Sequence, residues 1–226
     1  MSEEHDGLEG ESMRTAIVSA AFELFAERGY DGATVADIAV RAGVGRRSFF
    51  RYFPTKEAVA FPDHEGTLAR MVAYLRDGAR DPDPIARACG AARLVMRMYA
   101  QNPEFSVRRY ALTREVTALK TYEKTVVWRY ERALADYLDQ RFATLPDGGI
   151  RASVIAAGIV AAHNHGLRAW LRSGVHGDVA AAVDRALDLV RRTWADSGDP
   201  VVVIARPGTP AWRLVQEIET ARAAHG

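Results

Sequence analysis

The sequence predicts an all-α protein, in which a three-helix head with a helix-turn-helix precedes a larger helical body. Apolar side chains recur with helical spacing in successive segments along the chain of 226 residues. Glycine and proline separate these segments, most clearly at Gly43, Asn102–Pro103 and residues 145–149. The β-prone run 201–205 is too short and isolated to form a sheet alone.

Length and composition leave room for two domains. Hydrophobic residues make up 48% of the chain, which is enough for a sizeable core. Cys89 is the single cysteine, which excludes an intrachain disulfide and suits a reducing cytoplasm. The longest uncharged run, 152–167, is shorter than the ~20 residues that span a bilayer. We therefore expect a cytoplasmic protein without a membrane segment.

The first helix of the head is expected to follow an acidic tail. Residues 1–11 are rich in Asp and Glu and lack the apolar stretch of a secretion signal, so we expect them to be disordered. Ser12 can act as the N-cap of a helix that continues to about Arg28. The buried stripe of this helix would be Ile17, Ala21, Leu24 and Phe25.

Two further helices complete the head. The Thr34 hydroxyl can accept from free N–H groups of the next helix, and Asp37 adds negative charge near its positive end. Gly43 can end that helix because glycine adopts the left-handed conformation without strain. Gly45 can then begin a third helix after a turn of the length that a helix-turn-helix requires. The buried face of the second helix would be Val35, Ile38, Ala39 and Ala42.

The third helix carries a cluster of positive charge. From Arg41 to Lys56 the sequence has five basic residues and no acidic residue, although the formal net charge of the whole chain is only +1. Phe49 and Phe53 are four residues apart and can both face inward. A solvated basic helix would explain the charges alone, but the caps and the glycine turn favour an interface with DNA.

Residues 17–57 resemble the tetracycline-repressor (TetR) family of one-component bacterial regulators. Gly45 and Phe50 depart from the family's pattern, in which Ser and Tyr are frequent, so each lacks a hydroxyl for phosphate. Beyond Glu57 the resemblance is architectural. The residues that match at the family's spacing are Ile17, Ala21, Leu24, Phe25, Gly29, Tyr30, Thr34, Val35, Ile38, Ala39, Ala42, Gly43, Val44, Phe49, Tyr52, Phe53, Lys56 and Glu57.

The resemblance implies a homodimeric transcriptional regulator, which we interpret as a repressor of a palindromic operator. By the same resemblance, Thr34, Tyr52 and Lys56 would contact phosphates. Arginine near the start of a recognition helix can bind guanine bidentately in the major groove. The domain that binds DNA would span residues 12–57. Its expected contacts are Thr34, Gly45, Arg46, Arg47, Ser48, Arg51, Tyr52 and Lys56.

The body, residues 58–226, is expected to begin with a helix that Pro62 interrupts. Because proline lacks the N–H that a continuing helix needs, this helix should kink or restart near Asp63. Its apolar stripe would then be Leu68, Met71, Val72 and Leu75. Further helices are predicted over residues 84–102, 104–112, 115–142, 150–171, 178–194 and 212–222.

Aromatic and Met side chains of the body predict a pocket for a small, largely apolar effector. In the family, such a ligand displaces the helix after Lys56 and changes the spacing between the two recognition helices. Arg109 or Arg114 could pair with a carboxylate or phosphate. The same side chains could instead form core, as such stripes usually do. The predicted lining is Met96, Tyr99, Tyr110, Arg114, Tyr122 and His163.

The last two long helices are candidates for the dimer interface. Residues 150–171 carry a face of small residues that permits close approach of another helix. In the family, two final helices from each subunit form a four-helix interface, although such stripes could also close the monomer core. The predicted interface is Gly158, Ala162, His165, Ala169, Val183, Leu187, Val190 and Trp194.

No motif in the sequence supports enzyme chemistry, a cofactor or a metal site. His163 and His165 are two residues apart, roughly 200° around a helix, so they cannot share a metal ion. Cys89 lies on an apolar stripe, where a structural thiol is the expected role. The alternative interpretation is a helical enzyme or structural protein that does not bind DNA.

Overall fold

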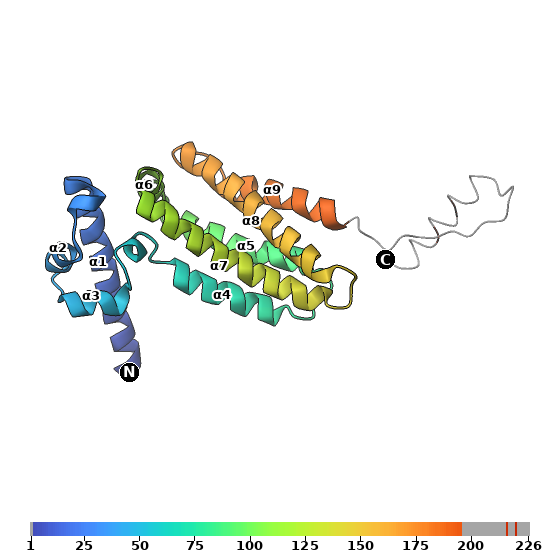
Figure 1. The fold of residues 1–226 in the computed structure, drawn as a ribbon, viewed down its shortest axis with the longest axis horizontal. Coiled ribbons are helices and arrows are strands. Elements are labelled where there is room, and N and C mark those ends of the chain that lie inside the picture. The colour runs from blue at the N-terminus through green and yellow to red at the C-terminus, as the bar shows by residue number, and fades with distance from the viewer. Residues whose placement is uncertain (1, 196–215, 217–219, 221–226) are drawn as a thin grey trace. The chain divides into compact units, whose positions relative to one another are not determined.

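The computed structural model describes residues 2–195, 216 and 220 of the chain, and the predicted all-α class is confirmed there (Figure 1). The chain divides into two compact units, residues 1–191 and 192–226, and the fold below is that of the first. The β-prone run 201–205 lies outside the described residues, as does most of the helix predicted over 212–222. No helix among the described residues is both long and apolar enough to cross a bilayer.

The helices follow one another with short connections. In chain order they are α1 (Ser2–Gly32), α2 (Val35–Arg41), α3 (Arg46–Tyr52), the 3-10 helix η1 (Glu57–Ala60), α4 (His64–Asp77), α5 (Pro84–Gln101), α6 (Pro103–Glu115), α7 (Thr117–Phe142), α8 (Gly148–Arg172) and α9 (Val179–Ala195).

The first helix is longer than predicted at both ends. It begins at Ser2, so the acidic residues 2–11 are helical and do not form the expected disordered tail. Ser12 therefore lies inside the helix and is not its N-cap. The helical backbone is interrupted at Gly29, where φ is 72°.

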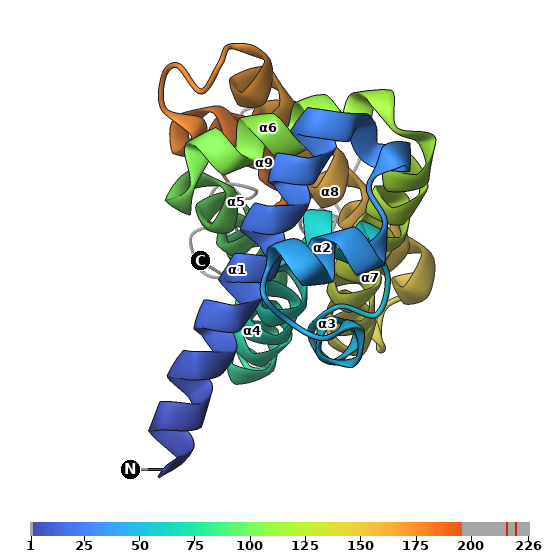
Figure 2. The same ribbon diagram turned by 90° about the vertical axis from the view of Figure 1, so that its left-hand side faces the viewer.

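Local signals set the helix-turn-helix as predicted. The Thr34 hydroxyl accepts from the Asp37 N–H at 3.1 Å, and the Asp37 carboxylate accepts from the Thr34 N–H at 3.1 Å, which is a capping box. Gly43 has φ 69°, the left-handed conformation expected after α2. Gly45 is the N-cap of α3, and Phe49 is fully buried beneath that helix. Figure 2 looks onto these three helices of the head.

The head shares its core with the body, so the predicted boundary at residue 57 does not separate two independent cores. Residues 58–61, in and after η1, are buried in the same cluster as the apolar face of α1. Leu119 of α7 is also part of this cluster. Side chains of α6, of α7 and of the residue between them also pack against it: Phe105, Leu112, Val116 and Tyr122.

The body is a bundle in which α7 lies along α8 and α4 lies along α5, while α5 contacts α8 and α4 contacts α7 (Figures 1 and 2). The buried face of α4 differs from the prediction, because Leu68 is half-buried and Val72 is 39% exposed. The face that turns inward is His64, Thr67, Met71 and Leu75. Two of these side chains are polar, and for that reason an apolar pattern did not reveal them.

Helix α9 comes into backbone contact with α8 at Gly166. A Cβ on Gly166 would lie 2.9 Å from the Val183 Cα, whereas a Cβ on Gly158 would lie 3.9 Å from the Val190 Cγ1. Backbone contact at Gly166 therefore requires glycine, and Gly158 has room for a methyl group.

We expect Gly166→Ala to lower the free energy of unfolding by about 1–3 kcal/mol, because α9 must shift to admit the methyl group. Gly158→Ala is the matched control and should be neutral or stabilising by up to about 1 kcal/mol, since alanine favours the helix. Urea unfolding followed by circular dichroism measures both. Equal effects of the two substitutions would contradict this account of the α8–α9 contact.

Candidate DNA-binding surface and body cavity

The basic surface of the head is formed by α3. Arg46, Arg47 and Arg51 are exposed on this short helix, and none of them forms an ion pair with a described residue. The Arg46 guanidinium lies 5.8 Å from the Phe50 ring centroid. Arg51 donates to the Tyr52 hydroxyl at 3.0 Å. Arg46 and Arg51 thus lie beside aromatic rings, and all three arginines keep their charge uncompensated by an acidic residue among the described residues.

Arg41, by contrast, is neutralised within the head. Its guanidinium donates to both carboxylate oxygens of Glu27, at 2.9 and 2.8 Å, and lies 3.4 Å from Glu23. The hydrogen bond from Arg41 lowers the pKa of the Glu27 carboxyl group. Counting charges along the sequence therefore overstated the patch, because Arg41 joins α2 to α1 and contributes little net charge.

Two predicted phosphate contacts have structural partners inside the head. The Lys56 ammonium donates to the backbone oxygens of Tyr30 at 2.9 Å and Ala33 at 3.0 Å, and lies over the Tyr30 ring. The Thr34 hydroxyl is occupied by the capping box with Asp37. Both residues shape the head, and their contacts with phosphate stay predictions.

The remaining predicted contacts, Gly45, Ser48 and Tyr52, lie at the start of α3 or within it. Gly45 is exposed at the helix start and has no side chain to cap it, while Ser48 is half-buried. Tyr52 is half-buried, and its ring lies 4.9 Å from the Arg51 guanidinium carbon. The structure therefore brings six of the eight predicted residues together without committing them elsewhere: Gly45, Arg46, Arg47, Ser48, Arg51 and Tyr52.

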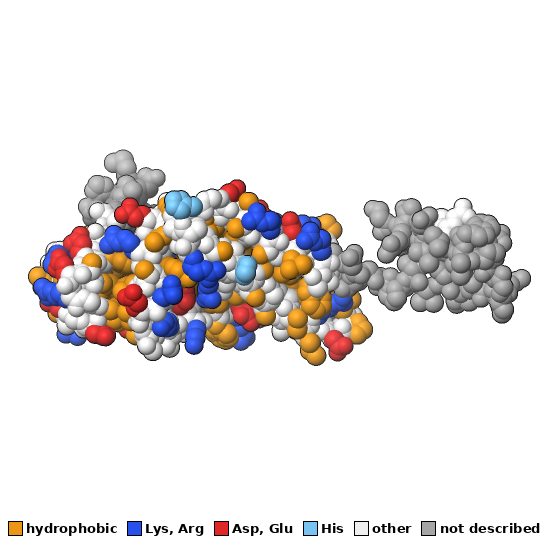
Figure 3. Space-filling model, turned by 90° about the horizontal axis from the view of Figure 1, so that it is seen from above, with side chains coloured by type: hydrophobic (Ala, Val, Ile, Leu, Met, Phe, Trp, Pro, Cys, Tyr) orange, Lys and Arg blue, Asp and Glu red, His pale blue; other side chains and the backbone are white. Residues whose placement is uncertain are grey.

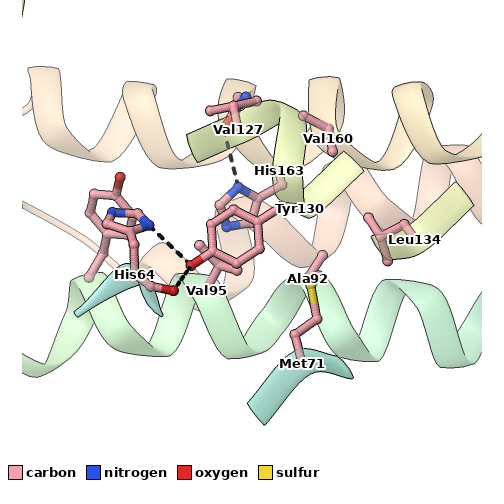
Figure 4. Close-up of a pocket in the computed structure, with 11 residues that line it drawn as sticks. His64, Met71, Ala92, Val95, Val127, Tyr130, Leu134, Val160 and His163 are labelled. Atoms are coloured by element: carbon pink, nitrogen blue, oxygen red, sulfur yellow. Dashed lines mark hydrogen bonds between the residues drawn. The ribbon is translucent and has the colours of Figure 1, made fainter. Parts of the chain in front are cut away.

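The body contains a small cavity between α4, α5, α7 and α8 (Figure 4). Its volume is about 40 Å³. The polar residues that line it are His64, Tyr99, Tyr130, His163 and Asn164, and the other lining side chains are apolar.

His64 is the polar residue that α4 contributes to this cavity. The Tyr130 hydroxyl donates to the His64 backbone oxygen at 3.0 Å and lies 3.1 Å from the His64 Nδ1. Because a tyrosine hydroxyl has one hydrogen, Nδ1 carries the proton and donates to the tyrosine oxygen. The Nε2 atom is then an acceptor, and it has no hydrogen-bond partner among the described residues.

A second histidine lies across the cavity on α8. His163 Nδ1 lies 3.4 Å from the Asn164 side-chain oxygen, and Nε2 has no partner among the described residues. Burial lowers the pKa of His163 to about 4. Burial, followed by the charge of Arg109, also holds the pKa of His64 well below its ordinary value. Both imidazoles are therefore neutral at neutral pH.

A second, adjoining cavity of about 30 Å³ shares Tyr99, Val127 and Asn164 with the first. Arg109 of α6 lines it and is only 3% exposed. Its guanidinium carbon lies 4.2 Å from the Tyr99 ring centroid. A buried cation thus lies beside the histidine-lined cavity. The sequence offered Arg109 and Arg114 as alternative partners for an anion, and of the two only Arg109 lines this cavity.

The structure divides the six residues predicted to bind a ligand. Tyr99 and His163 line the first cavity, and Tyr110 lines the second with Tyr99. Met96 is buried but lines neither cavity, and Arg114 is exposed. Tyr122 packs on Phe61 at the joint between head and body, with ring centroids 5.3 Å apart.

Residues that the sequence did not indicate include His64 and Tyr130. Tyr130 lies within the helix predicted over residues 115–142, and His64 lies two residues after the interruption at Pro62. A signal for His64 existed in its spacing from Met71 and Leu75, which places the three residues on one face of a helix. Cys89 is fully buried, and burial raises the pKa of its thiol to about 11, which agrees with a structural thiol.

The predicted dimer residues also fall into two groups. Val183 and Leu187 are fully buried within the single chain, and their place in a dimer interface stays a prediction. They close the contact of α9 with the body. His165 and Ala169 are exposed on α8. The remaining four residues are half-buried: Gly158, Ala162, Val190 and Trp194.

Comparison with known proteins agrees with this geometry. Residues 17–61 match the family described as bacterial regulatory proteins, tetR family. The transcriptional regulator MftR of Mycobacterium tuberculosis is 29% identical over 126 residues, which cover 55% of this chain and 63% of that protein. The alignment thus spans less than two thirds of that relative.

Two solved structures share the fold. NalD of Pseudomonas aeruginosa, a repressor of the MexAB-OprM multidrug efflux pump, is 20% identical with a TM-score of 0.55, covering 81% of this chain and 96% of that one. FadR of Thermus thermophilus in complex with lauroyl-CoA is 20% identical with a TM-score of 0.51, covering 87% and 99%.

The described residues thus combine a helix-turn-helix, whose second helix exposes three arginines without an ion-pair partner among them, with a helical bundle that contains a cavity. Its head is similar to the DNA-binding part of the tetR family of bacterial regulatory proteins, whose model matches residues 17–61. The alternative of a helical enzyme or structural protein has no support, because the relatives are transcriptional regulators.

The buried neutral histidines should make the fold sensitive to acid. An unfolded chain binds a proton at each imidazole below pH ~6.5, whereas folded His163 does so only near pH 4. Stability therefore falls as the pH drops between these values. We expect His163 to account for a loss of about 2 kcal/mol between pH 8 and pH 5.

His163→Gln should remove that part of the pH dependence, measured by urea unfolding at the two pH values. His176→Gln is the matched control, since His176 is exposed. A variant at position 163 that keeps the full acid sensitivity of the unmodified protein would show that this imidazole is not a source of it.

Proposed function

We propose that the chain is a transcriptional repressor that binds DNA through α3 and works in the bacterial cytoplasm. The observation that carries this proposal is the uncompensated charge of Arg46, Arg47 and Arg51 on the exposed side of a helix-turn-helix. Phosphates supply the missing counter-charge, and their condensed counterions are released when the protein binds. The affinity should therefore fall steeply as salt is raised.

Within this surface, position on α3 suggests different roles. Arg46 and Arg47 are the first two residues of the helix, where side chains of a recognition helix contact base edges. Arg51 and Tyr52 lie at its other end and are proposed to contact the phosphate backbone. Thr34 and Lys56 support the same surface through the capping box and the end of α1.

We further propose that two copies bind a palindromic operator. Two-fold symmetric heads require half-sites on one face of DNA, ~34–36 Å or a multiple apart. One side of α8 exposes small and apolar side chains at helical spacing, and Figure 3 shows hydrophobic side chains among basic ones on that face of the molecule. The exposed residues are Ile150, Val154, Ala157, Ala161, His165 and Ala169.

An effector is proposed to bind in the body and to release the head from DNA. At about 40 Å³ the cavity is far smaller than the ~300–1,000 Å³ of small-molecule sites, so a ligand must push a wall aside. The wall formed by α4 leads directly to the head through Pro62 and Phe61. FadR of Thermus thermophilus binds lauroyl-CoA in this fold, which supports an effector with an apolar part.

The coupling then follows from the shared core. Displacing His64 moves the start of α4, and Phe61, three residues earlier, is buried in the core of the head. A ligand that favours the displaced α4 shifts the population toward a head spacing that fits the operator poorly. By reciprocity, operator DNA must weaken ligand binding by the same factor.

Replacing Arg46 or Arg47 by Ala should weaken binding to the cognate site by about 1–3 kcal/mol, roughly 5- to 150-fold, and relax preference at a base pair. The operator for this test comes from selecting bound sequences out of a random DNA pool, and fluorescence anisotropy measures the affinities.

Arg41→Ala is the matched control, because its charge is already neutralised by Glu27 and Glu23, and it should change affinity little. Lys56→Ala should weaken all sequences alike. If Lys56→Ala changes base preference while neither α3 substitution does, the assignment of roles is wrong.

The dimer should be disrupted by Ala161→Asp, since a charge without a partner is costly in a packed interface. Ala161 is exposed in the single subunit, so the fold itself should survive. Ala143→Asp, after the end of α7, is the control. Light scattering should show a dimer for the unmodified protein and the control but a monomer for Ala161→Asp, and a monomeric unmodified protein rejects the interface.

A further inference from the structure

The body contains a buried positive charge without a counter-ion. Arg109 is 3% exposed, forms no ion pair with a described residue, and its Nη1 atom has no hydrogen-bond partner there. Three aromatic rings surround the guanidinium, with centroids 4.2 Å away for Tyr99, 5.5 Å for Phe105 and 5.8 Å for Phe61. Arginine stays charged inside proteins, so this cation cannot be removed by losing a proton.

The aromatic rings offset only part of the cost of this burial. A desolvated cation over an aromatic ring gains less free energy than the burial of an ion without a partner costs. The site is therefore stabilised most by an anion that reaches the guanidinium.

Other unpaired polar atoms gather around the same place. Five buried side-chain polar atoms of the described residues have no hydrogen bond, and four of them line the two adjoining cavities. The two cavities share Tyr99, Val127 and Asn164. The four atoms are His64 Nε2, Arg109 Nη1, Thr113 Oγ1 and His163 Nε2.

Their hydrogen-bonding types differ along the cavities. Arg109 and Thr113 line one end and offer donors, which suits a carboxylate. His64 and His163 line the other end, where Nε2 of His64 is an acceptor. Figure 4 shows these imidazoles and the Tyr130 ring pointing into the space between the helices, next to apolar side chains such as Met71 and Val95.

We propose that the ligand of the body is a small organic acid, whose carboxylate binds Arg109 and Thr113 and whose apolar part extends toward His64. This inference rests on the proposed effector site and names the chemical class that the site takes. The inference also names the contact through which the ligand would act on the head. A carboxylate that draws the Arg109 guanidinium away from Phe61 changes the packing around a side chain of the head core.

An acidic residue of the chain, Glu123, could take the place of the ligand carboxylate beside Arg109. Glu123 lines the cavity of Arg109, and its carboxylate lies 4.0 Å from Arg168 in a weak ion pair. If Glu123 turned inward, it would occupy the position that we assign to the ligand. Glu123→Gln should then strengthen the binding of an added acid by about tenfold or more.

The test compares acids with their neutral amides on the full chain. Hexanoate and phenylacetate are measured against hexanamide and phenylacetamide by isothermal titration calorimetry. We expect each amide to bind about 10- to 100-fold more weakly than its acid, since a charged hydrogen bond is lost. Equal binding of acid and amide, or no binding of either acid, overturns the proposal without the need for a variant.

Variants then assign the preference to one residue. Arg109→Gln should abolish the preference for acid over amide, and Arg108→Gln, its exposed neighbour on α6, should keep it. If Arg109→Gln fails to fold, Arg109→Lys retains a charge and should keep a reduced preference. A preference that survives Arg109→Gln contradicts the assignment of the ligand carboxylate to this guanidinium. A tenfold gain in acid binding in Glu123→Gln supports the assignment and shows that Glu123 competes for the same site.

Operator binding separates this inference from the proposed function. An acid that binds through Arg109 but leaves the affinity for operator DNA unchanged supports the anion site and contradicts release by an effector. A protein that responds to neither acid and still binds DNA contradicts the anion site and leaves DNA binding through α3 in place.

Discussion

The packing of Phe61 ties the two parts of this protein together. Its ring is buried in the core of the head, yet it lies 5.3 Å from Tyr122, 5.6 Å from His64 and 5.8 Å from the Arg109 guanidinium, all in the body. A head with its own separate core could stay in place while the body changed. Here the two share side chains, so a change at the cavity reaches the helix-turn-helix through direct contact.

Charge is distributed to serve two purposes in the head. Arg41 holds α2 to α1 through its ion pair with Glu27, and Lys56 binds backbone oxygens at the end of α1. The arginines of α3 have no such partners among the described residues. The result is a rigid frame that presents its uncompensated charge on one helix. In the body, Arg109 is likewise a cation without an acidic partner among the described residues, and it lies among the aromatic rings of Tyr99, Phe105 and Phe61.

The sequence was sufficient wherever structure depends on neighbours along the chain. The capping box of Thr34, the left-handed Gly43 and the glycine start of α3 were all predicted, because each is set within a few residues. Contacts between distant segments were not readable in this way. His64 turns inward toward Tyr130, which is 66 residues away, and Arg41 pairs with Glu27, which is 14 residues away. The burial of Val183 depends on Gly166 in another helix.

The small size of the cavity has a consequence for the speed of the proposed response. Because about 40 Å³ is too small for the proposed effector, α4 must move away from α7 before a ligand can enter, and this movement breaks the hydrogen bonds between His64 and Tyr130. Ligand association is then limited by that opening at high concentration, and its observed rate reaches a plateau instead of rising in proportion. Helix motions of this kind take microseconds to milliseconds. A brief pulse of effector shorter than the opening time would pass without a response.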